Sequence, residues 1–239
     1  MVPERIFILT GAGLSAESGL GTFRDEGGLW NEYSLEDVAS IDGYMRDPKL
    51  VLDFYNLRRK SLEHAHHNAA HSALATLESA WRERGGEVFI CTQNVDDLHE
   101  RAGSKNVAHM HGELSKARCE ACSEVFRWAE DLDVERRCPA CGVGGYVRPH
   151  IVWFGEMPLE MERIQEELAL ADFFVAIGTG GAVYPAAGFV SEAARAGIAS
   201  MEINLAPSDN ADAFDDTLYG PASETVPAWV HSLTHGEEW

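Results

Sequence analysis

The sequence predicts an α/β fold in which a doubly wound parallel sheet carries a smaller inserted domain. Short apolar runs alternate with segments of helical periodicity along the 239 residues, and the turn Gly11-Ala12-Gly13 follows the first apolar run. Strands that alternate with helices favour a parallel sheet covered on both faces. Two C-x-x-C pairs in the middle of the chain indicate that a small metal-binding module interrupts this pattern.

Each expected element follows from a local pattern of apolar residues. Strands are expected at Arg5–Thr10, Glu87–Thr92, Asp172–Ile177 and Ile198–Asn204. Helices are expected from near Leu14, at Pro48–Glu63, Asn68–Arg84, Val95–Arg101, Pro158–Ala169, Tyr184–Ala196 and Ser223–Leu233. We therefore expect a Rossmann-like nucleotide-binding domain from residues 1–34, 85–117 and 148–239, a helical module at 35–84, and a zinc-ribbon module at 118–147.

The four paired cysteines Cys119, Cys122, Cys138 and Cys141 have the spacing of a zinc ribbon. Four thiolates fill the tetrahedral shell of one Zn²⁺ ion, which makes the expected role structural rather than catalytic. Disulfides or a thioredoxin-like redox pair are the alternatives, and a cytosolic compartment disfavours disulfides. Cys91 lies in an apolar run and is expected to be a buried strand thiol.

Composition limits the class of partner. The formal net charge of −20 argues against nonspecific binding to nucleic acid or to an anionic membrane. It suits a cationic partner such as a lysine-rich protein segment, although plain solubility or a salty cytoplasm is the simpler explanation. No signal peptide and no apolar stretch long enough to cross a bilayer are evident, so we expect a cytoplasmic location.

The glycine turn fits the G-x-G-x-x-A form of the dinucleotide fingerprint over residues 11–16. The first glycine permits the turn, the second lets phosphate approach the backbone, and amides at the helix start hold the pyrophosphate. The acidic residue that usually follows about 20 residues later, at the end of a second strand, is missing, because the sequence of residues 21–28 predicts a loop there. Arg24 in this loop is expected near a phosphate or ribose, or in a surface ion pair with Asp25 or Glu26.

Polar residues follow the second strand, at the sheet edge where ligands of α/β proteins bind. Gln93, Asn94 and Asp96 could hold a carboxamide and a ribose, although Asn94 could instead cap a helix.

Histidines supply the candidate bases. His111 precedes Gly112-Glu113 and suits a general base for a sugar hydroxyl; a structural histidine is the alternative for His111 and for its neighbour His109. Four other histidines are expected on a solvated helical face without metal: His64, His66, His67 and His71.

Motifs along essentially the whole chain resemble those of the sirtuins, a family of NAD-dependent protein deacylases, and most closely the bacterial CobB-like type. They are, in order, Gly11-Ala12-Gly13-Leu14-Ser15, Thr22-Phe23-Arg24, Thr92-Gln93-Asn94-Val95-Asp96, His111-Gly112-Glu113, the four cysteines, Arg148-Pro149, Val152-Trp153-Phe154-Gly155-Glu156 and Gly178-Thr179. The resemblance implies that NAD and an acyl-lysine meet between a large Rossmann domain and a small domain. It implies that the lysine acyl oxygen displaces nicotinamide and that His111 then helps to deprotonate a ribose hydroxyl. Free lysine and O-acyl-ADP-ribose are the implied products.

The resemblance also assigns site residues. The implied catalytic residues are His111, Asn94 and Asp96. The implied NAD-binding residues are Gly11, Ala12, Gly13, Ser15, Thr22, Phe23, Arg24, Trp30, Gln93, Asn94, Val95, Asp96, His111, Gly178, Thr179, Gly180, Asn204, Leu205, Ala206 and Ala222. The implied substrate residues are Ala39, Tyr55, Arg58, Val152, Trp153, Phe154, Gly155 and Glu156. Gly21, Asp97 and Gly180 depart from the usual pattern and bear on NAD affinity rather than on the reaction type.

Two residues of the sequence indicate which acyl groups the protein could accept. Tyr55 and Arg58 are expected on one helix face, where a phenol and a guanidinium can bind the carboxylate of a succinyl or malonyl chain. The pair resembles the Tyr-x-x-Arg of the desuccinylase-like class, and Ala39 resembles its pocket-widening residue. The alternative is that Tyr55 only packs and Arg58 extends to solvent.

The substrate is expected to be an extended acyl-lysine peptide bound by a monomer. An ADP-ribosyltransferase, an NAD hydrolase and a noncatalytic docking module are the rival functions.

Overall fold

The computed structural model describes residues 3–21 and 33–236. Its main sheet has six strands in the order β3-β2-β1-β7-β8-β9, and every neighbouring pair is parallel. The strands are β1 (Arg5–Thr10), β2 (Glu87–Thr92), β3 (Val107–His109), β7 (Phe173–Ile177), β8 (Ala199–Asn204) and β9 (Asp216–Tyr219). The four expected strands are confirmed to within one residue at each end, whereas β3 and β9 were not expected.

The strand order places a ligand site. From β1 the chain order runs outward through β2 and β3 on one side, and β7, β8 and β9 lie on the other. The strand order therefore reverses next to β1, and ligands of open α/β sheets bind at the carboxyl ends of the strands at such a point. Thr10 pairs with Thr92 and with Ile177, so β1, β2 and β7 end level with one another at that edge.

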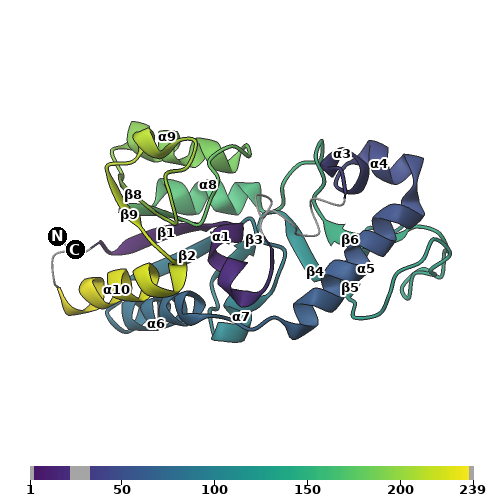
Figure 1. Ribbon diagram of the computed structural model, residues 1–239, viewed down its shortest axis with the longest axis horizontal. Helices are drawn as coiled ribbons and strands as arrows, with labels where there is room; N and C mark the ends of the chain where they lie inside the picture. Colours follow the sequence, from purple (N-terminus) through teal and green to yellow (C-terminus); the bar gives the residue numbers. More distant parts are fainter. Residues whose placement is uncertain (1–2, 22–32, 237–239) are drawn as a thin grey trace.

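Alternate residues of each strand face opposite helix layers. Ile6 and Ile8 of β1 pack with α6 (Ala69–Glu83) and α10 (Ala222–His235), whereas Phe7 and Leu9 pack with α8 (Met161–Ala169) and α9 (Phe189–Ala196). Figure 1 shows these two pairs of helices on opposite sides of the sheet. Helix α6 falls within the helical module expected at residues 35–84, but its apolar face packs on the main sheet beside α10.

The second part of the molecule, to the right in Figure 1, combines helices with a small sheet. Its helices are α3 (Leu35–Val38), α4 (Ile41–Arg46) and α5 (Pro48–His64), and its antiparallel sheet has the order β5-β4-β6, with β4 at Gly112–Cys119, β5 at Val125–Arg127 and β6 at Val147–Ile151. Helix α5 begins with Pro48 at a position that needs no amide donor, and the Asp47 side chain accepts the Leu50 N–H at 3.0 Å.

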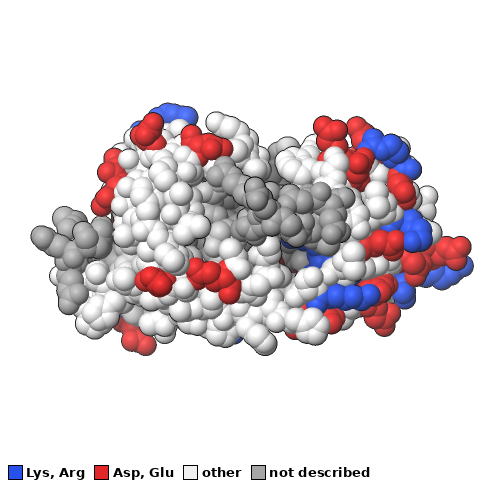
Figure 2. Space-filling model, in the orientation of Figure 1, with Lys and Arg blue, Asp and Glu red and all other residues white. Residues whose placement is uncertain are grey.

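Several helices start later than the sequence predicts, because turns precede them. Helix α7 comprises Leu98–Ala102, α8 starts at Met161, and a 3₁₀ turn at Ala186–Gly188 precedes α9. Short helical turns also occur at α1 (Ala12–Ser15), Ala16–Ser18 and Ala211–Ala213. In the described part of the chain, every helix is too short or too polar to cross a bilayer. Acidic side chains are scattered over the face drawn in Figure 2 rather than gathered in one patch.

Candidate active site

Two glycine turns interlock at the carboxyl ends of β1 and β7. The Gly13 N–H donates to the Gly178 carbonyl at 2.9 Å, and the Gly11 N–H donates to the Ile177 carbonyl at 3.0 Å. A Cβ atom on Gly11 would lie 2.7 Å from the Gly178 oxygen, and one on Gly13 would lie 2.8 Å from the Gly178 Cα. The fingerprint glycines therefore allow the backbones of the two turns to touch, in addition to any approach of phosphate that the sequence predicts.

A buried polar network connects these turns to the end of β2. The Ser15 hydroxyl donates to Asp96 at 3.0 Å and accepts from the Asn94 amide at 3.1 Å. The same amide donates to the Gly11 carbonyl at 3.0 Å, and Asp96 also accepts the Leu98 N–H. Burial raises the pKa of Asp96, and the Leu98 and Ser15 donors partly offset this rise. The structure thus brings together Ser15, Asn94 and Asp96, which the sequence analysis assigned to one site.

Asn94 is not a helix cap. Helix α7 starts at Leu98 with Asp97 in the capping position, and the side chain that accepts from its first turn belongs to Asp96. The Asn94 side chain instead joins the turn after β1 to Ser15. The capping alternative for Asn94 is therefore wrong.

Sequence reasoning missed a histidine layer beneath this network. His71 was expected on a solvated face, but it is fully buried on α6, and its Nε2 lies 3.5 Å from the Ser15 hydroxyl. Its ring lies 5.1 Å from that of His99, whose Nε2 is 3.1 Å from the Thr10 hydroxyl. Burial lowers the pKa of His71 to about 4 and lowers the pKa of His99 well below its usual value, so both rings are neutral. Asn68, which caps α6, also donates to the Leu14 carbonyl at 2.8 Å. This capping asparagine was the sequence signal for the start of α6, the end of the helix that carries His71.

His111 lies in the turn between β3 and β4, with a tautomer that its hydrogen bond defines. Its Nδ1 lies 3.1 Å from the Gln93 carbonyl oxygen, which can only accept, so Nδ1 carries the hydrogen. The Nε2 atom of the neutral ring therefore has a free lone pair. Burial lowers the pKa of His111 against the opposing effect of the Gln93 carbonyl, which favours this neutral form. The half-buried side chain is thus prepared to accept a proton.

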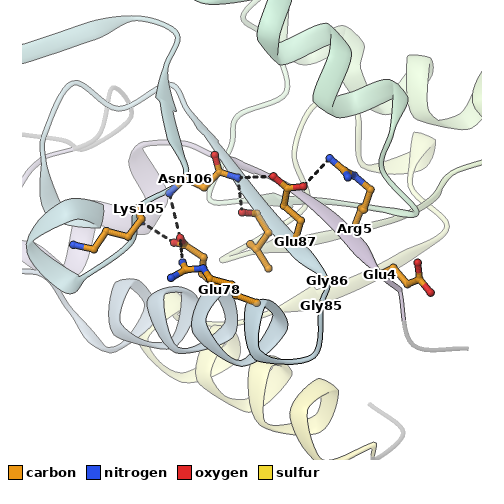
Figure 3. Close-up of a pocket in the computed structure, with 10 residues that line it drawn as sticks. Glu4, Arg5, Glu78, Gly85, Gly86, Glu87, Lys105 and Asn106 are labelled. Carbon is orange, nitrogen blue, oxygen red and sulfur yellow. Dashed lines mark hydrogen bonds and ion pairs between the residues drawn. The ribbon is translucent and has the colours of Figure 1, made fainter.

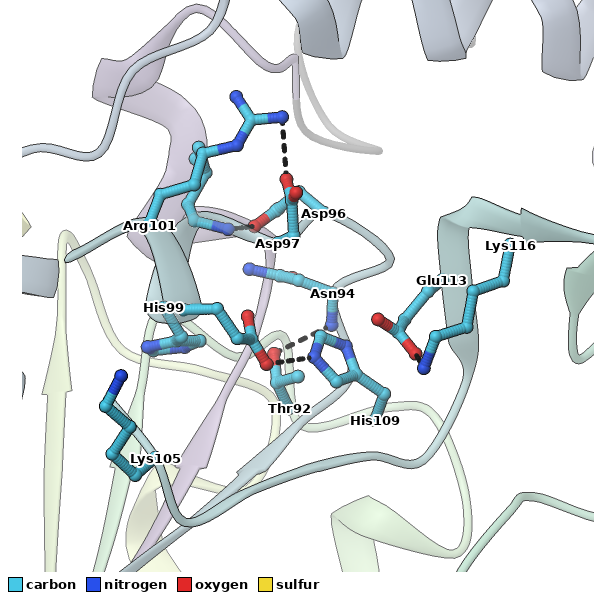
Figure 4. Close-up of polar contacts among 12 residues, drawn as sticks. Thr92, Asn94, Asp96, Asp97, His99, Arg101, Lys105, His109, Glu113 and Lys116 are labelled. Carbon is cyan, nitrogen blue, oxygen red and sulfur yellow. Dashed lines mark hydrogen bonds and ion pairs between the residues drawn. The ribbon is translucent and has the colours of Figure 1, made fainter. Parts of the chain in front are cut away.

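His109 has a different environment from His111. Its Nε2 forms an ion pair with Glu100 at 2.8 Å, and Figure 4 shows the His109 ring close to Asn94. Burial opposes the charge of His109, but the hydrogen bond and charge of Glu100, the charge of Glu113 and a contact with the Asn94 backbone together outweigh it and raise the pKa of the imidazole. Nearby, Asp97 pairs with Arg101 at 2.8 Å. These contacts favour a structural role for His109, which was the open alternative for that residue.

The remaining NAD-binding expectations are distributed along the same edge. Thr179 is buried after β7, its carbonyl accepts the Asn204 side-chain amide at 2.8 Å, and the next residue, Gly180, is exposed. Leu205 and Ala206 are exposed after β8, and Ala222 begins α10. Ala12, Gln93 and Val95 lie in the turns after β1 and β2. Four expected residues, Thr22, Phe23, Arg24 and Trp30, lie outside the described residues.

The segment expected to bind substrate backbone forms a short bridge to the helical part of the molecule. The Phe154 N–H donates to the Ala39 carbonyl at 2.8 Å, and Phe154 bridges to Ser40. Phe154 and Gly155 are exposed, whereas Val152 is partly covered and donates its N–H to the His111 carbonyl at 2.9 Å. The segment therefore joins the turn that carries His111 to Ala39.

Tyr55 and Arg58 lie on α5 and differ in burial. Tyr55 is 1% exposed, and its hydroxyl accepts the indole N–H of Trp153 at 3.0 Å. Arg58 is half-buried, with its guanidinium carbon 5.9 Å from the centroid of the Phe54 ring. Burial lowers the pKa of Arg58, and the neighbouring Tyr55 and Asp96 act in the opposite direction. Arg58 therefore lies within electrostatic range of the Ser15–Asp96 network and does not simply extend to solvent.

A charged quartet supports the substrate segment from the small sheet. Arg148 is almost completely buried, donates to Glu120 at 2.7 Å and pairs closely with Glu156. Arg118 bonds to the same two carboxylates, at 2.6 and 2.7 Å. Glu156 also accepts the Trp153 N–H at 2.8 Å. The side chain of Glu156 is thus engaged inside the protein.

The four cysteines converge as the sequence predicts. Their sulfur atoms all lie within 4.8 Å of one another, with Cys119 and Cys141 3.9 Å apart and Cys122 and Cys138 3.7 Å apart. A tetrahedral zinc with Zn–S bonds of about 2.3 Å requires sulfur separations of about 3.8 Å. The backbone N–H groups of Cys141 and Ala140 lower the pKa of the Cys138 thiol to about 7. The donor set fits one structural zinc ion. Cys91 is confirmed as a buried strand thiol.

A separate pocket lies at the opposite, amino-terminal edge of the sheet (Figure 3). Glu78 accepts from Arg82 and from the backbone N–H of Lys105, and Arg5 pairs with Glu87 at 2.8 Å. These contacts pair charged groups of the pocket with one another and stabilise the local structure.

Comparison with known proteins agrees with this site. The Sir2 family model matches residues 11–185. An NAD-dependent protein deacylase from Caulobacter vibrioides is 58% identical over 229 residues, which cover 96% of each chain. A Sir2 homologue solved in complex with NAD has a TM-score of 0.89 and 37% identity, covering 98% of this chain and 91% of its own. A Sir2 protein solved with a deacetylated p53 peptide and 3'-O-acetyl ADP ribose has a TM-score of 0.80 and 27% identity, covering 99% and 95%.

The fold and the site define a sirtuin. This chain belongs to the Sir2 family, because the family model matches well over half of it and the Caulobacter relative aligns along nearly its whole length.

Proposed function

We propose that this chain is an NAD-dependent protein-lysine deacylase that releases nicotinamide, O-acyl-ADP-ribose and free lysine. The observation that carries the proposal is His111 with an unprotonated Nε2, in the turn next to the Ser15–Asn94–Asp96 network. Its relatives and structural neighbours are named for this activity or solved with its ligands. Bound NAD supplies the ribosyl group that accepts the acyl chain.

The chain's own residues have distinct proposed roles. His111 accepts a proton at Nε2, while the Gln93 carbonyl holds its ring in the required tautomer. Asn94 and Asp96 fix the shape of the nicotinamide end of the site through Ser15 and the turn after β1. The interlocked glycine turns place backbone against the pyrophosphate. Positioning together with one base is sufficient for this chemistry.

We further propose that the acyl range includes succinyl and malonyl groups. Tyr55 stays protonated because burial raises its pKa to about 12, so it can donate to a carboxylate. Arg58 on the same helix supplies a cation. We assign the small residue Ala39 to the same pocket because it resembles the pocket-widening residue of the desuccinylase-like class.

The remaining proposals concern context. We propose a monomeric, cytoplasmic enzyme that takes lysine-bearing peptides in extended form along Val152–Glu156. We also propose a division into a Rossmann domain, a helical module and a zinc module, with α6 counted in the Rossmann domain because it packs on the main sheet.

The decisive experiment is mass spectrometry of matched acetyl- and succinyl-lysine peptides incubated with and without NAD. Loss of the acyl group together with formation of O-acyl-ADP-ribose, only when NAD is present, is the expected result. Release of nicotinamide at the same rate without an acyl-lysine would instead favour an NAD hydrolase or ADP-ribosyltransferase.

A further inference from the structure

The Trp153 side chain is held from several sides at the end of the proposed acyl pocket. It is 3% exposed, and the guanidinium carbon of Arg148 lies 4.0 Å from the centroid of its ring. The Tyr44 ring lies 4.9 Å away, and Glu156 accepts the Trp153 backbone N–H. These contacts fix the direction of the indole N–H, which points at the Tyr55 hydroxyl 3.0 Å away.

This hydrogen bond has only one possible polarity. An indole N–H can donate but has no lone pair to accept with, so the Tyr55 oxygen must be the acceptor. The hydroxyl hydrogen of Tyr55 is consequently turned away from Trp153. Within the described part of the chain, the Trp153 indole is the hydrogen-bond partner of this hydroxyl. Tyr55 keeps its hydrogen at physiological pH, because burial raises its pKa to about 12.

We propose that Trp153 is a positioning residue for acyl selection: by donating to Tyr55 it fixes that hydroxyl as a donor toward the acyl chain. The inference rests on the proposed deacylase function and on the proposed pocket at Tyr55 and Arg58. An acyl group that ends in a carboxylate offers an acceptor to the oriented hydroxyl, whereas an acetyl group has no acceptor at its methyl end. The role lies in the indole nitrogen and is separate from any pairing of the Trp153 backbone with a peptide.

The test is a double-mutant cycle between Trp153→Phe and Tyr55→Phe. The readout is the ratio of kcat/KM for succinyl-lysine to kcat/KM for acetyl-lysine on one peptide sequence, measured in each protein with saturating NAD. This ratio is independent of the fraction of folded enzyme, because both substrates meet the same preparation. One neutral hydrogen bond corresponds to about threefold to tenfold in such a ratio. We expect Trp153→Phe to lower the ratio by that amount, and to lower it no further when Tyr55→Phe is already present.

A second replacement separates the donor from the bulk of the indole. In the benzothiophene isostere of tryptophan, introduced at position 153, sulfur takes the place of the N–H while the two-ring shape is kept. We expect it to lower the ratio as Trp153→Phe does.

Three outcomes would overturn the inference. An unchanged ratio in the isostere protein would show that the N–H is not used. Losses that multiply in the double mutant would show that Trp153 acts without the Tyr55 hydroxyl. A wild-type enzyme that deacetylates but does not desuccinylate would overturn the proposed acyl range and this inference with it, whereas the first two outcomes leave the acyl range intact.

Discussion

Replacing Arg58 by methionine tests whether the α5 pair binds a carboxylate. The change keeps most of the length of the side chain and its apolar stem but removes the cation. Arg58 is half-buried, so its charge is less well solvated than that of a surface residue. A charge-assisted hydrogen bond to a buried group contributes about 1.5–3 kcal/mol. The Coulomb energy of a pair at about 4 Å with an effective dielectric constant near 20, about 4 kcal/mol, sets the upper limit.

The expected result is a loss specific to acidic acyl groups. An energy of about 1.5–3 kcal/mol corresponds to roughly tenfold to a hundredfold in kcat/KM. The assay compares succinyl- and acetyl-lysine on one peptide, for wild type and variant side by side. We expect kcat/KM for succinyl-lysine to fall by that factor relative to acetyl-lysine.

Lys60→Met provides a matched control. Lys60 lies two residues further along α5, is exposed, and pairs with Asp131 at 2.7 Å. Its removal changes the net charge by the same amount without altering the pocket, so it should leave the preference between acyl groups unchanged. A parallel fall for both substrates in Arg58→Met, or the same shift in Lys60→Met, would refute the carboxylate role of Arg58.

Three further predictions address the base, the metal and acid stability. His111→Ala should lower kcat/KM by about 10²–10⁴ without changing the zinc content. In the wild type, the loss of kcat/KM on acidification should have its midpoint below pH 6.5, because burial lowers the pKa of His111. Near wild-type turnover in the variant would exclude the role of His111 as the base. Cys138→Ser should release zinc and lower the melting temperature, and full metal content by elemental analysis would show that the four sulfurs do not form one site. Burial lowers the pKa of His71 to about 4 in the folded chain, against about 6.5 when unfolded. The pKa difference contributes about 3 kcal/mol to the free energy of unfolding; this contribution is fully present above pH 6.5 and is lost as the pH falls toward 4. Denaturant titrations should show a shallower acid dependence for His71→Phe than for wild type, and equal slopes would contradict this assignment.

Local patterns predicted the features that depend on local sequence. The apolar runs of β1 and β2 were predicted to the residue, because a strand buried on both faces requires an uninterrupted apolar segment. The zinc centre was predicted because the spacing of Cys119, Cys122, Cys138 and Cys141 itself dictates tetrahedral coordination. By contrast, β3 and β9 have only three and four residues, and their pairing depends on neighbouring strands rather than on their own composition.

The missed features depend on contacts between distant segments. His71 follows three other histidines in the sequence, and its burial involves contacts with distant segments such as the turn that carries Ser15, 56 residues away in the chain. The position of α6 on the main sheet follows from its packing with α10, near the other end of the sequence. The hydrogen bond between Trp153 and Tyr55 likewise joins residues that are 98 positions apart in the chain.

The interlocked glycines decide where this site can vary. Each of Gly11, Gly13 and Gly178 is confined by the main chain of the opposite turn, so no choice of side chain elsewhere can make room for a Cβ there. Gly178 also has φ +63°, which disfavours any other residue. A library that randomises these turns would consist mostly of misfolded proteins, whatever nucleotide was offered. Tyr55 and Arg58 contact other side chains instead, Trp153 and Phe54 respectively, so a search for altered acyl preference can start from them.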